Sequence, residues 1–288
     1  MLYKIANILF EDEDTNYIVV ILGALCFPLI FYVAFVYGLL PGMFLTLVAY
    51  YYFIKYTKEK HWYQLVISAL SINLAILLIG NNLIHLLAIF AVAVIYFIRN
   101  KDWKVIAFIL SCVFLMSASK SVITNYYEVK SQKEIAEGVP KITWIAMGMQ
   151  EGEREAGWWN RFNYDIMPEE EHDTKRITEI SKTSMKQRLN VFRDNPKYAL
   201  DFYQRKYENQ FIEPTFQSLL VTAPQRNFSN ETTLEKIRDF FVKQIYFNHT
   251  HTVLEFIMKV FQVFVYLFTF VFTVVMYKRK NEFFAIIP

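Results

Sequence analysis

The feature that most constrains this chain is a series of long apolar runs. They cover residues 16–56, 62–99, 105–122 and 252–277. A helix needs about 20 mostly apolar residues to cross a bilayer, because roughly 30 Å of hydrocarbon is crossed at about 1.5 Å per residue. Of the 288 residues, 55% are hydrophobic and 20% are charged, an imbalance that one water-soluble core of this size does not require. We therefore predict an α-helical polytopic membrane protein.

The runs divide into six predicted membrane-spanning helices. These are residues 17–38, 43–56, 62–79, 83–98, 105–122 and 253–277, with short loops at 39–42 and 80–82. A further helix is predicted to begin at Phe283, and the chain stops inside it. This ending favours a fragment of a longer protein, with a short hydrophobic tail as the alternative.

The distribution of basic residues predicts the orientation. Cytoplasmic loops of membrane proteins are enriched in Lys and Arg. Three alternate loops carry such clusters: Lys55, Lys58 and Lys60; Arg99, Lys101 and Lys104; and Lys278, Arg279 and Lys280. The two uncharged loops and the polar segment 123–251 then lie on the outer face of the cell membrane. We predict a membrane domain at 1–122 with about five spanning helices, an extracytoplasmic domain at 123–251, and a spanning helix with the start of another at 252–288.

The polar segment has the pattern of a mainly helical domain, α or α+β. Asp173 and Thr174 are expected to cap a helix through Arg193, a second helix covers 197–211, and a third follows the caps at 230–233 and runs to Phe247. The third helix places one set of apolar residues on a single face, Leu234, Ile237, Phe240, Phe241 and Ile245. This face lies either on the domain core or on the membrane surface.

Residues 140–163 combine an apolar, strand-like stretch with a glycine-rich loop that contains aromatic, amide and acidic residues. Aromatic rings can stack on the apolar faces of sugars, while amides and carboxylates can bond hydroxyl groups. We therefore take Trp144, Trp158 and Asn160 as candidate sugar-binding residues. The alternative is that these tryptophans are core or membrane-interface aromatics.

A second candidate cluster follows in the polar segment. Lys206 and Gln210 are four residues apart and share one helix face, and Glu213 follows shortly after. A cation and an amide on one face can approach the same anionic or hydroxylated ligand. The competing interpretation is a solvated helix face.

Several function classes have little support in the sequence. The net charge of +3 gives no basic patch for nucleic acid, and no phosphate-binding glycine motif is present. Cys26 and Cys112 lie inside apolar runs, where a thiol behaves as a small hydrophobe. The five histidines are scattered, so we assign no metal and no cofactor.

Two segments of the polar domain resemble a known family. The segments read Pro140-Lys141, Trp144-Ile145-Ala146-Met147-Gly148-Met149 and Gly157-Trp158-Trp159-Asn160, then Asn195-Pro196, Phe202, Lys206, Gln210 and Glu213-Pro214-Thr215-Phe216-Gln217-Ser218. Together with residues 35–38 and Pro41-Gly42, they look like polytopic glycosyltransferases of Gram-positive bacteria, of the GT-C class and related to protein mannosyltransferases.

The resemblance implies a membrane transferase that moves a sugar from a polyprenyl-phosphate donor to a glycan, lipid or protein acceptor outside the cytoplasm. Lys141 or Lys206 would then meet the donor phosphate. In that class an acid in the first external loop usually acts as the general base, yet loops 39–42 and 80–82 contain none. The catalytic residue is therefore left unassigned and is expected outside this chain. The alternative is a non-enzymatic membrane-anchored protein of the cell envelope that binds a glycan or a partner.

Overall fold

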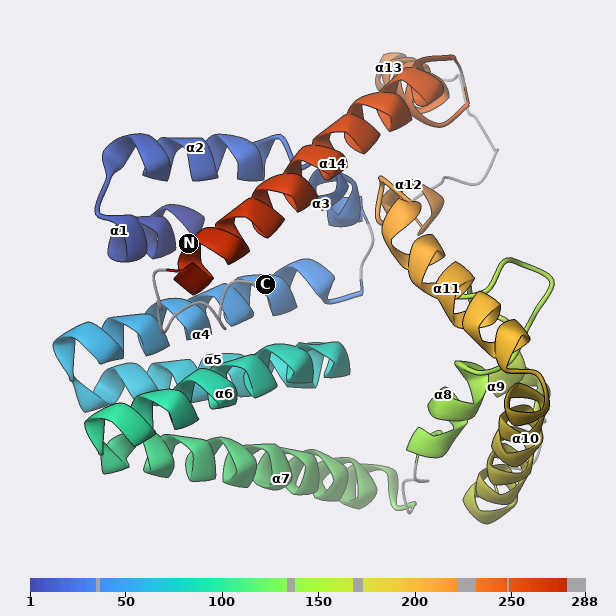
Figure 1. Cartoon of the computed structure of the whole chain (residues 1–288), viewed down its shortest axis with the longest axis horizontal. Helices are drawn as coiled ribbons and strands as arrows, with labels where there is room; N and C mark the ends of the chain where they lie inside the picture. Colours follow the sequence, from blue (N-terminus) through green and yellow to red (C-terminus); the bar gives the residue numbers. More distant parts are fainter. Residues whose placement is uncertain (35–36, 134–137, 168–172, 222–231, 248, 279–288) are drawn as a thin grey trace. The chain divides into compact units, whose positions relative to one another are not determined.

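The computed structural model describes residues 1–34, 37–133, 138–167, 173–221, 232–247 and 249–278. Every regular element in these ranges is helical (Figure 1). The chain forms two compact units, here called the apolar unit (Met1–Val122 with Pro214–Pro288) and the polar unit (Ile123–Glu213). The polar unit begins where the predicted extracytoplasmic domain begins and ends earlier, at Glu213. The predicted further helix at Phe283 lies outside the described residues.

The apolar unit contains most of the long helices. In chain order they are α1 (Leu2–Phe10), α2 (Glu13–Ala24), α3 (Phe27–Phe31), η1 (Tyr32–Ala34), α4 (Leu39–Glu59), α5 (Trp62–Leu78), η2 (Gly80–Asn82), α6 (Leu83–Asn100), α7 (Trp103–Ser131), α12 (Ser218–Val221), α13 (Thr233–Tyr246) and α14 (His249–Lys278). The C-terminal part of α7, from Ile123 on, belongs to the polar unit. Its core lies between α4, α5, α6 and α7, where Phe53, Ile72 and Ile89 are fully buried and the rings of Phe53 and Phe108 lie 5.5 Å apart.

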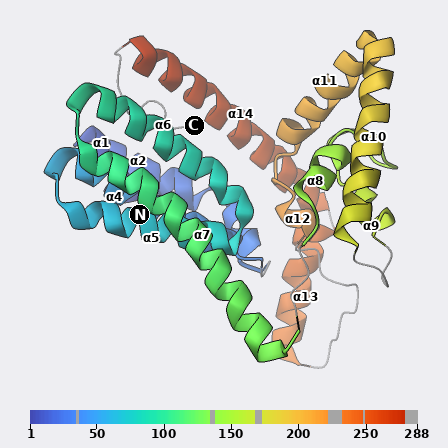
Figure 2. The ribbon, with the colours of Figure 1, turned by 90° about the horizontal axis from the view of Figure 1, so that it is seen from below.

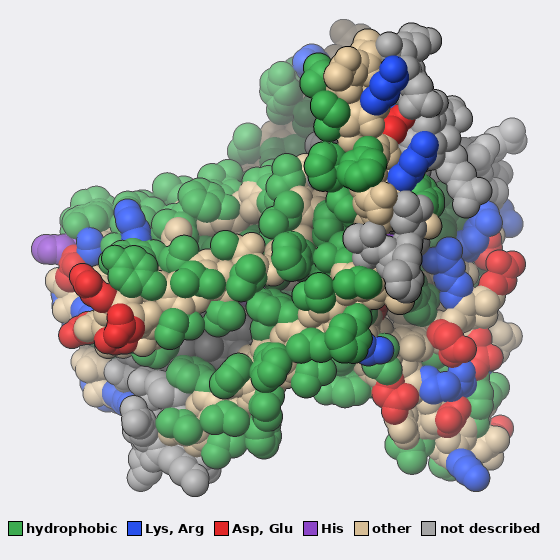
Figure 3. All heavy atoms as spheres, turned by 90° about the horizontal axis from the view of Figure 1, so that it is seen from above, with side chains coloured by type: hydrophobic (Ala, Val, Ile, Leu, Met, Phe, Trp, Pro, Cys, Tyr) green, Lys and Arg blue, Asp and Glu red, His purple; other side chains and the backbone are tan. Residues whose placement is uncertain are grey.

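Three helices of the described part are long and apolar enough to cross a membrane, which indicates a multi-pass membrane protein. They are Gly80–Asn100, Trp103–Ser131 and His251–Val275, and the apolar helix Trp62–Leu78 is shorter. Figure 3 shows hydrophobic side chains spread over much of the visible face, as a lipid-facing surface requires.

The first two predicted spans need correction. Residues 17–38 are not one helix, because α2 ends at Ala24 and a short helix, α3, follows with Pro28 in its first turn. Proline has no N–H to donate and its ring collides with the preceding turn, so it ends the earlier helix and suits the start of the next. The predicted loop at 39–42 is instead the first turn of α4, where Pro41 sacrifices no helical hydrogen bond.

The polar unit contains α8 (Lys141–Met147), α9 (Phe162–Asp165), α10 (Thr174–Asp194) and α11 (Pro196–Ile212). The predicted helices are confirmed: Asp173 accepts hydrogen bonds from the first turn of α10, and Asn195 caps α11 just before Pro196. The stretch at 141–147 that looked strand-like is α8. Both α8 and α11 pack on α10 (Figure 2), and a buried Thr143–Ser181 hydrogen bond of 2.9 Å joins α8 to α10.

Candidate functional site

The glycine-rich loop between α8 and α9 is held by α10 and α11. A buried backbone carbonyl oxygen without a hydrogen-bond donor costs about 1–3 kcal/mol of folding free energy. The carbonyl oxygens of this loop therefore need donors. Three side chains donate hydrogen bonds to backbone carbonyl oxygens of the loop. They are Arg188 Nε to Met149 O (2.7 Å), Lys206 Nζ to Gly148 O (2.5 Å) and Asn209 Nδ2 to Ala156 O (2.9 Å).

Two glycines allow the loop its close approaches. Gly157 has φ of 100°, and a Cβ at this position would lie 3.1 Å from the carbonyl oxygen of Lys206. A Cβ at Gly152 would lie 2.6 Å from that of Asn160. Side chains at these two positions would push the loop out of its path, so the loop shape depends on both glycines.

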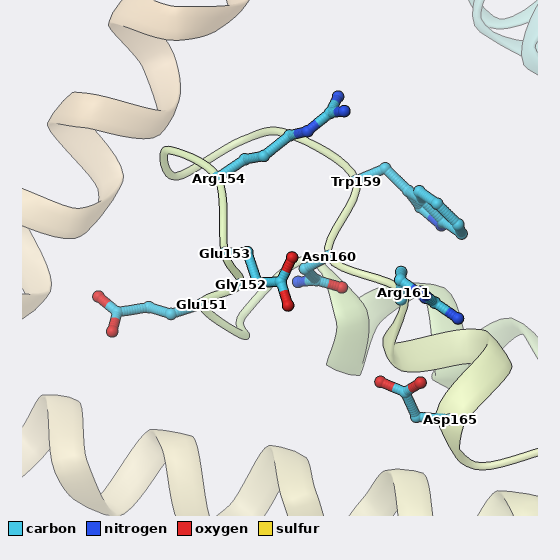
Figure 4. Close-up of a pocket in the computed structure, with 8 residues that line it drawn as sticks. All are labelled: Glu151, Gly152, Glu153, Arg154, Trp159, Asn160, Arg161 and Asp165. Atoms are coloured by element: carbon cyan, nitrogen blue, oxygen red, sulfur yellow. The ribbon is translucent and has the colours of Figure 1, made fainter.

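The loop lines an open hollow of ≈ 940 Å³ (Figure 4), a volume suited to a ligand of a few sugar rings or smaller. In Figure 4 the side chains of Glu153 and Asn160 lie together near the centre, the carboxylate of Asp165 lies below them, and Glu151 and Arg154 extend outward. The lining residues are Glu151, Gly152, Glu153, Arg154, Trp159, Asn160, Arg161 and Asp165.

Trp159 presents an oriented aromatic ring at this hollow. The side chain is 52% exposed, yet its Nε1 donates a 3.1 Å hydrogen bond to Oδ1 of the buried Asn163. Tyr164 contacts the ring edge-on, with centroids 5.6 Å apart. An exposed ring with a fixed orientation loses little conformational freedom when a flat apolar ligand surface stacks on it.

The carboxylates around the hollow fall into two groups. Glu151 and Glu155 lie within 3.8 Å and 3.7 Å of the guanidinium of Arg205. Glu153 and Asp165, by contrast, form no ion pair with any residue that the structure describes. These two carboxylates therefore remain able to accept hydrogen bonds from ligand hydroxyl groups.

Of the candidate residues from the sequence, Asn160 alone lines the hollow. Its Nδ2 donates to the carbonyl oxygens of Met147 (2.9 Å) and Gln150 (3.1 Å), and its Oδ1 accepts from the N–H of Phe162 (3.2 Å). Both of its N–H donors and one of its two acceptor positions are used within the loop. Asn160 therefore positions the lining residues around it.

Lys206 is placed behind the loop by its bond to Gly148. Desolvation lowers the pKa of the Lys206 ammonium group from its ordinary value. The Lys206 ammonium group is therefore partly buried and bonded to the protein backbone.

The other candidates do not line the hollow. Lys141 and Trp144 are exposed on α8, and Gln210 is exposed on α11. Glu213 is half-buried immediately after α11, and the half-buried Trp158 has the guanidinium of Arg154 5.8 Å from its ring. These five residues therefore lie outside the hollow that Asn160 lines.

Glu153, Arg161 and Asp165 were not among the candidate residues predicted from the sequence, and Trp159 appeared there only within the motif Gly157-Trp158-Trp159-Asn160. The acidic run Glu151–Glu155 within a glycine-rich loop was the available signal, because such a loop presents side chains to solvent. Among the described residues no group of three His, Cys, Asp or Glu side chains is arranged to hold a metal ion.

Comparison of the chain with protein-family models, with curated protein sequences and with solved structures gives no match.

Proposed function

We propose that this chain is a multi-pass protein of the cell membrane that binds the sugar of a polyprenyl-phosphate donor in the hollow at 151–165, as part of a glycosyltransferase. The observation that carries the proposal is the combination of the oriented, exposed Trp159 ring with two carboxylates that have no ion-pair partner in the described part of the chain, Glu153 and Asp165. The three long apolar helices fit a lipid-linked donor, whose sugar is presented at a membrane surface.

Each lining group has a chemical role in this proposal. The C–H face of a pyranose stacks on the ring of Trp159, and its hydroxyl groups donate hydrogen bonds to Glu153 and Asp165. Arg161 supplies a cation for the phosphate that carries the sugar, since a guanidinium can bond two phosphate oxygens at once. Because these contacts are charged or stacked, the site would favour a glycosyl phosphate over a free apolar ligand.

Glu153 is the proposed general base, in place of the residue outside this chain that the family resemblance implied. It would take the proton of an acceptor hydroxyl while that oxygen bonds to the anomeric carbon, and the bond from that carbon to the phosphate oxygen would break to release polyprenyl phosphate. Glu151 and Glu155 suit this role less well, because each forms an ion pair with the guanidinium of Arg205.

The proposed topology places the basic loops inside and residues 123–251 outside the membrane. One part of this topology, that two of the basic loops lie on the same side, is supported by contacts within the apolar unit, because the C-terminal end of α4 is bonded both to the loop after α6 and to the residue that follows α1. Loops bonded to one another share one end of a helix bundle and hence one side of a membrane.

A pair of matched tryptophan variants tests the binding proposal. Trp159→Ala should weaken binding of a short-chain polyprenyl-phosphate hexose by the purified full chain about 10-fold or more, as loss of an aromatic stacking contact plus its burial would. Trp144→Ala is the control, because Trp144 is 48% exposed in the same unit but does not line the hollow. Equal effects of the two substitutions would refute the hollow as the sugar site.

A second pair of variants, Glu153→Gln and Glu155→Gln, distinguishes sugar transfer from sugar binding alone. Glu153→Gln should abolish transfer to an added acceptor while donor binding persists, and Glu155→Gln should retain transfer. If the unsubstituted chain binds a glycan but releases no polyprenyl phosphate under any acceptor condition, the non-enzymatic glycan-binding function would replace the transferase.

A further inference from the structure

Helix α13 buries an acidic residue and exposes its apolar residues, the reverse of a helix that packs on a water-soluble core. Its acidic residue Asp239 is 2% exposed, whereas Leu234 is 79% exposed and both Phe240 and Phe241 are 58% exposed. A helix that packs on a soluble protein buries its apolar stripe and leaves its charges in water. Here the apolar stripe is on the outside.

The local sequence explains why α13 is a stable helix in this orientation. Thr232 and Glu235 form a reciprocal capping box at its start. The stripe Leu234, Ile237, Phe241 and Ile245 recurs every three or four residues, while Asp239 lies on the opposite side and is paired with Arg238 at 2.7 Å. The inward position of Asp239 therefore fixes the stripe on the outer side of the helix.

The end of α13 is joined to the start of a membrane-spanning segment. His251 begins the apolar segment His251–Val275, and a ring nitrogen of His251 lies 2.8 Å from the carbonyl oxygen of Ile245 in the last turn of α13. The chain from Tyr246 to His251 can extend at most about 18 Å, at roughly 3.6 Å per residue. The C-terminal end of α13 is thus held at the depth at which α14 enters the bilayer.

We propose that α13 lies in the lipid headgroup layer, with Leu234, Ile237 and Phe241 inserted into the acyl boundary of the membrane. The occupant of the exposed stripe is lipid, because the last turn of α13 is bonded to the start of the spanning segment of α14 and because an amphipathic helix beside a bilayer gains free energy in proportion to the apolar area it buries there. Lys236 lies on the opposite side of the helix, where its ammonium group reaches headgroups and water. This proposal is independent of the sugar-binding proposal.

Spin labelling of the full chain in phosphatidylcholine vesicles tests the position of α13. A Cys26→Ser background leaves only the buried Cys112, and single labels are introduced by Phe241→Cys or, as a matched control on the opposite side, Lys236→Cys. We expect the label at 241 to collide at least threefold more with oxygen, which partitions into lipid, than with a water-soluble nickel complex, and the label at 236 to show the reverse preference.

Two results would overturn the proposal. Equal access of the nickel complex to both labels would place the stripe in water, and poor access of both reagents to the label at 241 would show that protein, such as a second copy of the chain, covers it. The unsubstituted chain provides a test without any substitution. A photoactivated lipid-phase reagent should modify the peptide containing 234–245, and its absence from that peptide when α14 is modified would also refute the lipid assignment.

Discussion

The hydroxyl of Tyr56 donates a hydrogen bond of 2.7 Å to the carboxylate of Asp102, joining the last turn of α4 to the loop between α6 and α7. Lys60, which ends α4 in a left-handed conformation, lies 3.8 Å from the same carboxylate. Nearby, Lys58 reaches Glu11 at 2.7 Å. Two of the three loops whose basic residues predict the cytoplasmic side are therefore bonded to each other.

This contact leads to a prediction about stability. Tyr56→Phe removes one hydrogen bond to a charged acceptor while keeping the fully buried ring, so we expect a loss of about 1–3 kcal/mol from the free energy of unfolding. Tyr52→Phe on the same helix is the control and should cost less than about 0.5 kcal/mol. Thermal unfolding of the purified chain in detergent measures both, and equal losses would contradict the assigned role of the bond.

Orientation in the membrane is tested by accessibility in intact cells. Cysteine introduced at Ser131, at the end of α7, should react with a membrane-impermeant thiol reagent, whereas cysteine at Asn100, in the last turn of α6, should not. Disruption of the cells should make Asn100→Cys reactive, which serves as its positive control. Labelling at 100 and protection at 131 in intact cells would reverse the topology.

Gly157 gives a prediction about the loop that forms the hollow. Gly157→Ala would place a Cβ 3.1 Å from the carbonyl oxygen of Lys206 at a φ of 100°, so we expect destabilisation of about 1–3 kcal/mol and faster amide exchange through the loop. At Gly138, an added Cβ would meet no atom within 4 Å. Gly138→Ala should therefore leave exchange in the loop unchanged, and a similar effect of both substitutions would count against the close packing at Gly157.

Lys206 predicts a pH dependence with a definite sign. Its pKa in the folded chain is lowered by desolvation, so between that pKa and the ordinary value of 10.5 the unfolded chain binds more protons than the folded one. Stability arising from this group must therefore rise with pH across that window and be lowest where both states are protonated. Lys206→Gln should remove this rise in unfolding experiments up to about pH 10, and an unchanged pH slope would contradict the assignment to Lys206.

The same substitution probes what Lys206 does. Because its Nζ holds the carbonyl oxygen of Gly148, Lys206→Gln should speed amide exchange in residues 148–157 before it affects the apolar unit. If Lys206 served only to bind a donor phosphate, exchange in the free protein would be unaffected while donor binding fell.

Elements whose signals lie within a few residues of one another could be predicted from local sequence alone. Asp173, Asn195 with Pro196, and Thr232 with Glu235 specify helix starts through hydrogen bonds that reach three residues or fewer along the chain. The long apolar runs likewise determined the helices α6, α7 and α14, because a length of about 20 apolar residues is a property of the segment alone. The same kind of local signal was present at Pro28, where a proline inside an apolar run divided one predicted span into separate helices.

Tertiary structure decided how these elements face one another. The apolar periodicity of α13 is plain in the sequence, but only the burial of Asp239 shows that the stripe points outward. The hollow depends on pairs that are distant along the chain, such as Lys206 and Gly148, which are 58 residues apart. No local pattern encodes which carbonyl a distant lysine will reach, since the packing of α8, α10 and α11 sets that distance. For this reason Glu153 and Asp165 emerged as site residues only once the loop was folded onto those helices.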